Sequence, residues 1–335
     1  NERIRQIGSP QRQIDLFKQV FQVQIGGLVD DQAQGAALVV LAKIDHTAAE
    51  CLILQPRHRN QKMMCQIDGS RIDRHGGILP VNRHKPFQKG LMWFRRDLRV
   101  QDNAALYHAL RSCAQVHCVF VLDRDILDPL PRADRRVEFI RESLVDLDRS
   151  LRQMAGQEHV GLIVRHAVAS VEIPRLALNL GVQSVFANHD YEPQAIDRDA
   201  VVRGALANNG IALHTYKDQV VFERDEVLTA NGRPYAVFTP YRNAWLRKVD
   251  GFYLKAYPVE NHASALAERA PDLRQTVPPL EAFGFERTNL ASLRMPTGAR
   301  GGHQLFSEFL GRMDRYHETR DFPKVKGPSY LGVHL

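Results

Sequence analysis

The chain has 335 residues, of which 44% are hydrophobic and 25% are charged, and its formal net charge is +7. These values are typical of a globular protein of about two domains and exclude collagen-like, mucin-like and wholly disordered chains. The longest uninterrupted apolar run, residues 36–42, is far shorter than the roughly 20 residues that cross a membrane, so no membrane partner is expected.

Cysteine content and charge distribution further limit the class of protein and the partners to be expected. The four cysteines are sparse, and no two of them have C-x-x-C spacing. Neither a disulfide framework nor a metal site is therefore expected, and the cytoplasm is the expected compartment. Residues 1–88 hold 12 Lys and Arg against 8 Asp and Glu, and residues 89–335 hold 33 against 30. Net charge alone therefore does not argue for nucleic-acid binding.

Residues 1–88 carry no recognisable motif and are rich in Gln. Within them, residues 14–24 fit a short amphipathic helix and residues 36–42 fit a buried strand. The polar stretch from 55 to 88 shows no sustained period. We interpret 1–88 as an extension, poorly ordered or upstream of the natural start, which packs little against the rest.

From residue 89 the pattern alternates between apolar strands and amphipathic helices. Asp102-Asn103 is expected to cap the first helix, Asp134 to start a long second helix, and Gly181 to end the third. The predicted strands are 91–95, 116–122, 160–164, 184–187 and 211–215. The second and third helices are predicted at 134–154 and 171–180, and a fourth helix is predicted at 195–208.

Short apolar strands that alternate with helices predict an α/β fold, a Rossmann-like parallel five-stranded sheet with helices on both faces. Such sheets bind ligands beyond the carboxyl ends of their strands. The sequence contains neither G-x-G-x-x-G nor a Walker A motif, which disfavours nicotinamide dinucleotide binding and P-loop chemistry.

The alternation ends after Lys217. A helix is expected around Asn243–Val249, and residues 256–300 are expected to be a long linker that crosses the surface. A further helix is predicted from Gly302 to about His317, with Leu305 and Phe309 on its apolar face.

The first predicted strand ends in W-F-R-R-D-L-R, residues 93–99. Residue types alone favour a structural cluster in which Arg95, Asp97 and Arg99 form a partly buried ion-pair network. In that arrangement, removal of the Asp97 carboxylate would leave two cations facing each other.

Four ordered motifs resemble the DNA photolyase and cryptochrome family. L-M-W-F-R-R-D-L-R-V-Q-D-N-A-A-L at 91–106 is similar to the family's opening, and V-F-T-P-Y-R-N-A-W-L at 237–246 to the segment that leaves its α/β domain. R-Y-H-E-T-R-D-F-P at 315–323 resembles the start of the flavin-binding domain. G-P-S-Y-L-G-V-H-L at 327–335 resembles its flavin phosphate loop.

The resemblance implies a deoxyribodipyrimidine photolyase, a carbon–carbon lyase that repairs cyclobutane pyrimidine dimers in ultraviolet-damaged DNA. Reduced FAD in a helical domain would donate an electron to the flipped-out dimer when light is absorbed. A cryptochrome-type blue-light photoreceptor is the alternative within the family. A nucleotide-binding α/β module is the alternative outside it. A monomer is expected.

Several C-terminal residues match family positions that bind FAD or DNA. Tyr316 matches a tyrosine at the flavin edge, and Arg320 matches an arginine that contacts DNA phosphate. The resemblance places the FAD diphosphate at the loop of Pro328, Ser329, Tyr330, Leu331 and Gly332. Pro328 and Gly332 stand where the family usually has Thr and Ser, so phosphate binding is expected to be weakened or rearranged. Without the motif, a half-buried tyrosine and a solvated arginine are the ordinary interpretations.

The expected antenna site also departs from the family pattern. Gln194 and Ala195 stand where folate-binding members place Asn-Glu. Without that carboxylate, methenyltetrahydrofolate is in doubt, and a deazaflavin or no antenna chromophore stays open. Glu192 is more simply interpreted as a carboxylate at a helix N-terminus.

The resemblance also sets the expected domain organisation. It divides the chain into an extension (1–88), an α/β antenna domain (89–218), an interdomain segment and linker (219–300) and the truncated start of a helical FAD-binding domain (301–335). The family's tryptophan chain has no counterpart here, because Trp93 and Trp245 match N-terminal core positions. No catalytic residue of the family is therefore identified, and the chain is expected to be an inactive fragment.

Overall fold

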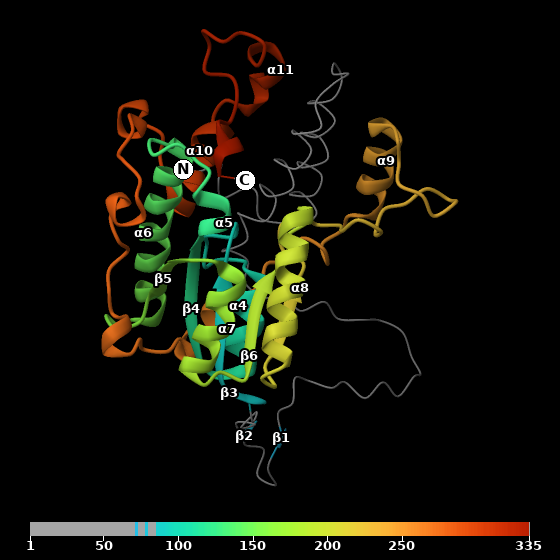
Figure 1. The fold of residues 1–335 in the computed structure, drawn as a ribbon. Coiled ribbons are helices and arrows are strands. Elements are labelled where there is room, and N and C mark those ends of the chain that lie inside the picture. Colours follow the sequence, from blue (N-terminus) through green and yellow to red (C-terminus); the bar gives the residue numbers. More distant parts are fainter. Residues whose placement is uncertain (1–70, 73–77, 80–84, 335) are drawn as a thin grey trace, which may run out of the picture.

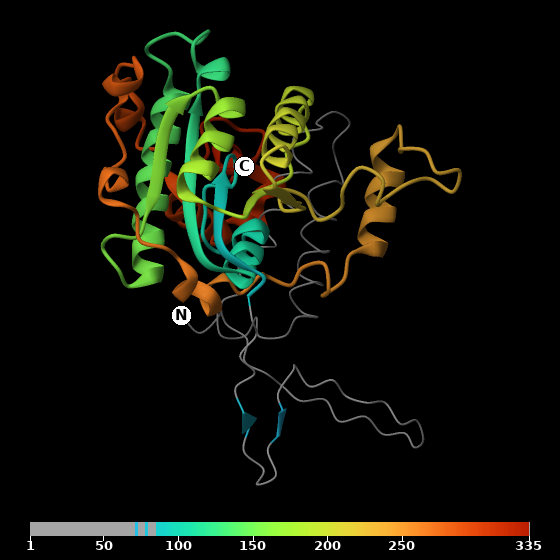
Figure 2. The same cartoon turned by 60° about the horizontal axis from the view of Figure 1, so that its bottom comes forward.

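The computed structural model describes residues 71–72, 78–79 and 85–334. The predicted helix at 14–24 and strand at 36–42, like most of the proposed extension, lie outside these residues. Two short strands, β1 (Arg71–Ile72) and β2 (Ile78–Leu79), pair antiparallel (Figure 2).

A five-stranded parallel sheet forms the centre of the molecule (Figure 1). Its strands are β3 (Phe87–Phe94), β4 (Cys113–Asp123), β5 (Leu162–Ala167), β6 (Ser184–Asn188) and β7 (Ala212–Tyr216). They lie in the order β5-β4-β3-β6-β7, so the chain runs from β3 outward to β5 and then returns to the centre at β6. The predicted parallel sheet is confirmed.

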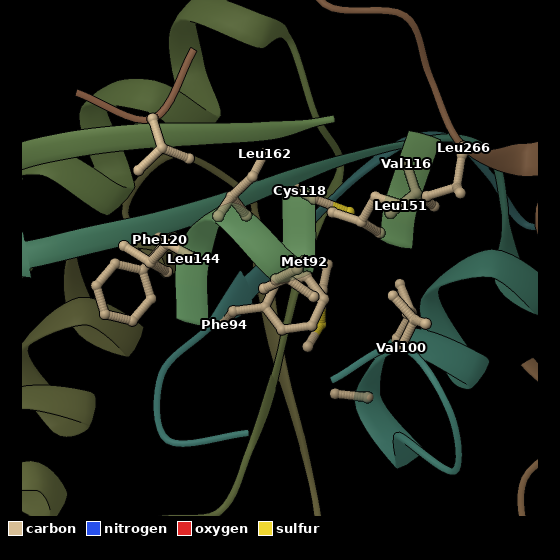
Figure 3. Packing of buried hydrophobic residues seen from close by; sticks show 14 of the residues in the cluster. Met92, Phe94, Val100, Val116, Cys118, Phe120, Leu144, Leu151, Leu162 and Leu266 are labelled. Atoms are coloured by element: carbon tan, nitrogen blue, oxygen red, sulfur yellow. The ribbon is translucent and has the colours of Figure 1, made fainter. Parts of the chain in front are cut away.

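Helices cover both faces of the sheet, as predicted. Met92 and Phe94 of β3 pack with α4 (Ala104–Ser112) and α6 (Arg135–Ala155) in the cluster shown in Figure 3. Leu91 and Trp93 point to the opposite face and pack with α7 (Ala169–Leu180) and α8 (Pro193–Ala207). A short helix, α5 (Arg124–Leu127), follows β4. Each central strand is buried on both sides, which explains its nearly continuous apolar sequence.

The predicted helix ends agree with the structure. Asn103 caps α4 by accepting a hydrogen bond from the Leu106 amide at 3.0 Å, and Asp134 caps α6 by accepting from the Arg136 amide at 2.8 Å. Gly181 ends α7 with a φ of 64°, a left-handed conformation that glycine adopts without steric cost. Local capping chemistry therefore sets these boundaries.

Two helices differ from the predicted bounds by more than two residues. Helix α9 (Phe238–Lys248) begins before Pro240, because a proline is tolerated in the first turn, where its missing N–H leaves no helical bond unmade. The predicted helix from Gly302 is α10 (Gly298–Leu310), which stops before Gly311. A 3₁₀ turn, η5 (Met313–Arg315), and a one-turn helix, α11 (Tyr316–Thr319), follow it.

The segment expected as a surface linker contributes to the core. It forms four 3₁₀ helices: η1 (Val259–Ala265), η2 (Pro271–Leu273), η3 (Leu280–Phe283) and η4 (Leu290–Leu293). Val259, Leu266, Leu280 and Phe283 are buried in the cluster that covers the α4 and α6 face of the sheet. The apolar residues are spaced irregularly along this segment, so no helical or strand period in the sequence indicated that these side chains are buried.

A separate small core lies beyond the sheet. Phe222, Trp245 and Leu254 are buried in it, and α9 stands apart from the sheet in both views (Figures 1 and 2). Trp93 and Trp245 are 1% and 5% exposed, so both are core residues as predicted. No helix among the described residues is long and apolar enough to cross a membrane.

Candidate functional site

The carboxyl edge between β3 and β6 is the switch point of the strand order, where doubly wound sheets bind ligands. Arg95 follows β3 and stands at this position. Its Nη1 donates to both carboxylate oxygens of Asp199 on α8 at 2.7 Å, and its Nη2 donates to the Asn188 carbonyl at the end of β6. The Arg95 and Asp199 side chains are only 8% and 13% exposed. A protein ion pair therefore closes the switch point.

Trp93 supports this arginine from the sheet. The Arg95 and Arg198 guanidinium carbons lie 4.8 and 5.1 Å from the centroid of the Trp93 ring. Arg198 also lies 3.5 Å from Asp199. Cation–π contact and the shared carboxylate fix both guanidinium groups over the buried ring.

The predicted cluster after β3 is a buried polar network, but Asp97 pairs differently from the prediction. Its carboxylate accepts hydrogen bonds from the Arg95 amide at 2.9 Å, Asn103 Nδ2 at 3.0 Å and Asn188 Nδ2 at 2.6 Å. Asp97 is 5% exposed. It therefore ties the turn after β3 to α4 and β6 through amides rather than through arginine side chains.

The two arginines of this turn have acidic partners far along the chain. Arg99 Nη2 donates to the Asp218 carboxylate at 2.8 Å, while Arg95 pairs with Asp199. Asp218 is 2% exposed and also accepts from the Ala104 amide at 3.0 Å, at the first residue of α4. The expectation that Arg95 and Arg99 face each other across Asp97 is therefore wrong, because each has its own carboxylate.

A pocket of about 460 Å³ lies one strand further toward the sheet edge. It opens between the carboxyl ends of β6 and β7, helix α8 and the segment 223–226. Its lining residues are His189, Asp190, Tyr191, Ile196, Asp199, Ala200, Arg203, Thr215, Glu223, Arg224, Asp225 and Glu226. Because the Arg95 ion pair closes the switch point, this pocket is the cavity beside it that is open to a ligand.

A chain of hydrogen bonds runs along one wall of this pocket. Thr215 Oγ1 lies 3.0 Å from His189 Nε2, and His189 Nδ1 contacts Glu223 Oε1. Tyr191 donates its hydroxyl to the same Glu223 oxygen at 2.8 Å. Burial and the Glu223 carboxylate raise the pKa of Tyr191. Burial acts to raise the pKa of Glu223, but hydrogen bonds from His189 and Tyr191 outweigh burial and lower it. This carboxylate is therefore an anionic acceptor.

The predicted antenna residues lie at the start of α8. Gln194 is exposed and Ala195 is 6% exposed, so Ala195 presents neither a polar atom nor surface to a ligand. Glu192 is the N-cap residue of α8, but its side chain makes no capping bond. Glu192 therefore lies at the N-terminus of α8, as the simple interpretation expects, and its carboxylate also accepts from Arg96 at 2.6 Å in an exposed ion pair.

The structure brings together the predicted flavin-edge tyrosine and DNA-contacting arginine. The Tyr316 ring packs edge-on against Phe309 of α10, with centroids 5.8 Å apart. The Arg320 guanidinium carbon lies 5.9 Å from the Tyr316 centroid. Burial raises the pKa of Tyr316, although Arg320 opposes the change. Tyr316 is therefore a half-buried phenol that Arg320 covers.

The predicted phosphate loop contains a single-turn 3₁₀ helix, η6 (Leu331–Val333). Ser329 Oγ accepts from the Leu331 amide at 3.4 Å, and Leu331 is 1% exposed and anchors the loop. Tyr330 is left-handed, with a φ of 59°. The Pro328 carbonyl accepts from Arg312 at 2.8 Å, whereas its ring nitrogen has no hydrogen to donate. A Cβ at Gly332 would meet nothing within 4 Å, so a serine would fit there. The loop fits a phosphate at the Ser329 hydroxyl but not at Pro328.

Sequence reasoning missed the pocket residues His189, Thr215 and Glu223. They belong to no motif, and Thr215 and Glu223 lie 26 and 34 residues after His189 in sequence. Their one signal was position, because His189 lies two residues after the predicted strand at 184–187 and Thr215 ends the predicted strand at 211–215. Carboxyl ends of neighbouring parallel strands meet at one edge of the sheet.

Comparisons with known proteins agree on one family. Residues 90–262 match the family model described as DNA photolyase. A deoxyribodipyrimidine photo-lyase of Synechococcus is 30% identical over 248 residues, which is 73% of this chain and 50% of the relative. The corresponding protein of Halobacterium salinarum is 32% identical over 258 residues, 73% and 51% of the two chains. Cryptochrome-2 of Gallus gallus is 28% identical over 241 residues, 70% and 39% of the two chains.

Solved structures show the same relationship. A bacterial class III photolyase from Agrobacterium tumefaciens has a TM-score of 0.62 at 23% identity, with 77% of this chain and 53% of that chain covered. An archaeal photolyase from Sulfolobus tokodaii, described with two FAD molecules, has a TM-score of 0.56 at 27% identity, with 74% and 51% covered. The chain spans about half the length of the curated photo-lyases it matches.

Proposed function

The chain belongs to the DNA photolyase family, and from this premise we propose that it serves light-driven, FAD-dependent repair of cyclobutane pyrimidine dimers in DNA. In this proposal, residues 89–218 form the α/β antenna domain, 219–300 an interdomain segment, and 301–335 the start of the FAD-binding domain. The family match over 90–262 carries the proposal. The named photo-lyase relatives are lyases, and the chain shares that class at the level of the family.

FAD, when bound, supplies the electron that opens the dimer's cyclobutane ring. The residues proposed to hold FAD are Tyr316 and the loop of 328–332. The Ser329 hydroxyl is the loop's polar group for a diphosphate oxygen, whereas Leu331 holds the loop in place from the core. Because Pro328 has no N–H and Gly332 has no hydroxyl, we expect this loop to retain FAD weakly.

Arg320 is the proposed contact to DNA. Its side chain is 13% exposed and lies over the Tyr316 ring, so its guanidinium is held in place before DNA arrives. A guanidinium presents paired donors that suit a phosphate oxygen. Arg315 is the last residue of η5, is 71% exposed, and offers a matched control of equal charge.

A second chromophore is proposed at the start of α8, near Gln194 and Ala195. The Sulfolobus tokodaii neighbour is described with two FAD molecules and a novel light-harvesting cofactor, which supports a second chromophore in this family. Ala195 offers no acceptor to a folate ring. The proposal therefore disfavours methenyltetrahydrofolate and leaves a deazaflavin or no antenna chromophore open.

The test combines flavin binding with repair. The purified chain is incubated with FAD, and bound flavin is measured by absorbance after gel filtration. Dimer loss from ultraviolet-irradiated oligothymidylate is then measured in light and in darkness. Arg320→Ala should weaken DNA binding and lower the salt dependence by about one phosphate contact, whereas Arg315→Ala should not. Dimer loss that proceeds equally fast in light and in darkness would refute the photolyase function, whereas no dimer loss in either condition agrees with the inactive fragment expected from the sequence.

The same experiment separates the alternatives. Flavin that is retained and reduced in light without loss of dimers would favour the cryptochrome-type photoreceptor; one relative of the chain, from Gallus gallus, is named Cryptochrome-2. A chain that binds adenine nucleotides but not flavin would favour the nucleotide-binding module.

A further inference from the structure

The hydrogen-bond chain in the pocket beside the switch point has the order of a hydrolytic triad. Thr215 supplies a hydroxyl, His189 lies 3.0 Å from it through Nε2, and Glu223 contacts the other ring nitrogen. A hydroxyl, a base within hydrogen-bond reach and a carboxylate that orients the base are the parts of nucleophilic acyl transfer. Photolyase chemistry at the C-terminal motifs uses none of these three residues.

The three side chains are accessible as well as aligned. His189 and Glu223 are 35% and 29% exposed, and all three residues line the pocket. Its volume of about 460 Å³ suits a small organic ligand. Tyr191 donates a second hydrogen bond to Glu223 at 2.8 Å, which holds the carboxylate on the side of His189. The base is therefore held in one orientation before any ligand enters.

The charges around the pocket define the ligand class. Among the lining carboxylates, Asp199 is paired with Arg95 and Glu226 with Lys217. In the part of the chain that the structure describes, neither Arg203 nor Arg224 lies within 4 Å of a carboxylate. Asp190, which lies 3.8 Å from Arg96, also lines the pocket together with Glu223 and Asp225, and these carboxylates would repel an anionic substrate. An uncharged ester meets no such repulsion, while the two guanidinium groups favour the negative charge that develops on its carbonyl oxygen.

We propose that this pocket is a second, light-independent active site that hydrolyses small uncharged carboxylic esters, with Thr215 as nucleophile, His189 as general base and Glu223 as the residue that positions His189. Thr215 Oγ1 forms a bond to the ester carbonyl carbon while its proton passes to His189 Nε2. The bond between that carbon and the alcohol oxygen then breaks, and the alcohol leaves with the proton from His189.

Water completes the cycle. Its oxygen attacks the acyl-threonine carbonyl as His189 takes its proton, the carboxylic acid is released, and Thr215 regains its hydrogen. The net reaction is ester plus water to acid plus alcohol, so no oxidant, cofactor or light is needed. Arg203 or Arg224 stabilises the oxyanion of each tetrahedral intermediate.

The full chain is assayed in darkness, without added flavin, with 4-nitrophenyl acetate as the probe. Thr215→Val keeps the size of the side chain and removes the hydroxyl, and His189→Gln removes the base. Each should lower kcat/KM by about 10²- to 10⁴-fold, down to the rate of free imidazole. Glu223→Gln should lower kcat more than it changes KM, because it removes the orientation of His189 without touching the ester. His317→Gln, a change at a 52% exposed histidine outside the pocket, should have no effect.

Trapping decides the role of Thr215. Rapid acid quenching followed by peptide mass spectrometry should find one acetyl group on Thr215 in the parent chain and none in His189→Gln. Equal rates for the parent chain and Thr215→Val, with both proteins folded by circular dichroism, would overturn the proposal. A rate that falls equally with His317→Gln would overturn it too, since surface imidazole would then account for the hydrolysis. Flavin binding and dimer repair are measured separately, so failure here leaves the proposed repair function untouched.

Discussion

Protonation of His117 should destabilise the fold as the pH falls. His117 lies on β4 beside Leu91 of β3, is 8% exposed, and its Nδ1 has no hydrogen-bond partner among the described residues. Burial, assisted by Lys89, lowers its pKa from 6.5 to about 4. Between these values the unfolded chain binds a proton that the folded chain does not. Stability is therefore complete above about pH 6.5 and falls toward pH 4, by about 3 kcal/mol for a shift of this size.

Urea unfolding at pH 7 and at pH 4.5 would measure this loss in the parent chain and in His117→Leu. The variant cannot titrate at this position, so it should lose about 2–3 kcal/mol less than the parent between the two pH values. His159→Leu, at an exposed histidine, serves as the control and should lose as much as the parent. If the parent and His117→Leu lose equal stability, His117 is protonated within the fold and the reasoning fails.

Three further predictions test the packing and the loop. Asp97→Ala should lower the free energy of unfolding in urea by about 3–5 kcal/mol, because several buried donors lose their shared acceptor. Asp97→Asn should lower it less. An unchanged free energy of unfolding in Asp97→Ala would show that water replaces the carboxylate. Gly161→Ala should destabilise by about 1–3 kcal/mol, since a Cβ would lie 2.4 Å from Asp148 Oδ1 at a φ of 153°, and an unchanged melting temperature would contradict that clash. Pro328→Thr combined with Gly332→Ser should increase the flavin retained after gel filtration several-fold, and no increase would remove this loop from the proposed FAD site.

The sequence predicted the sheet because its signals are local. Each central strand is an apolar run, and Asn103, Asp134 and Gly181 mark helix ends through capping that involves only neighbouring residues. Strand type, helix caps and the parallel arrangement follow from such patterns. The start of α9 lies before the expected Asn243, because Pro240 stands in its first turn and a proline there marks no helix boundary.

Pairings between distant residues could not be predicted in the same way. Arg95 and Arg99 were expected to share Asp97, yet their partners lie 104 and 119 residues away. No spacing rule links an arginine to one carboxylate among many, so the partner is set by the sheet's geometry. The pairing of the pocket residues could not be predicted for the same reason, because His189 and Thr215 meet only where β6 and β7 lie side by side.

The core contribution of residues 259–285 has a consequence for synthesis on the ribosome. The last strand ends at Tyr216, but Leu280, Phe283 and Phe285 complete the packing over one face of the sheet. At about 5–20 residues per second, the ribosome needs on the order of seconds to extend the chain from one to the other. During that interval α4 and α6 can already cover this face of the nascent sheet, but the apolar surface that Leu280, Phe283 and Phe285 bury in the finished fold stays exposed. Productive folding of this domain therefore waits for translation to pass Phe285.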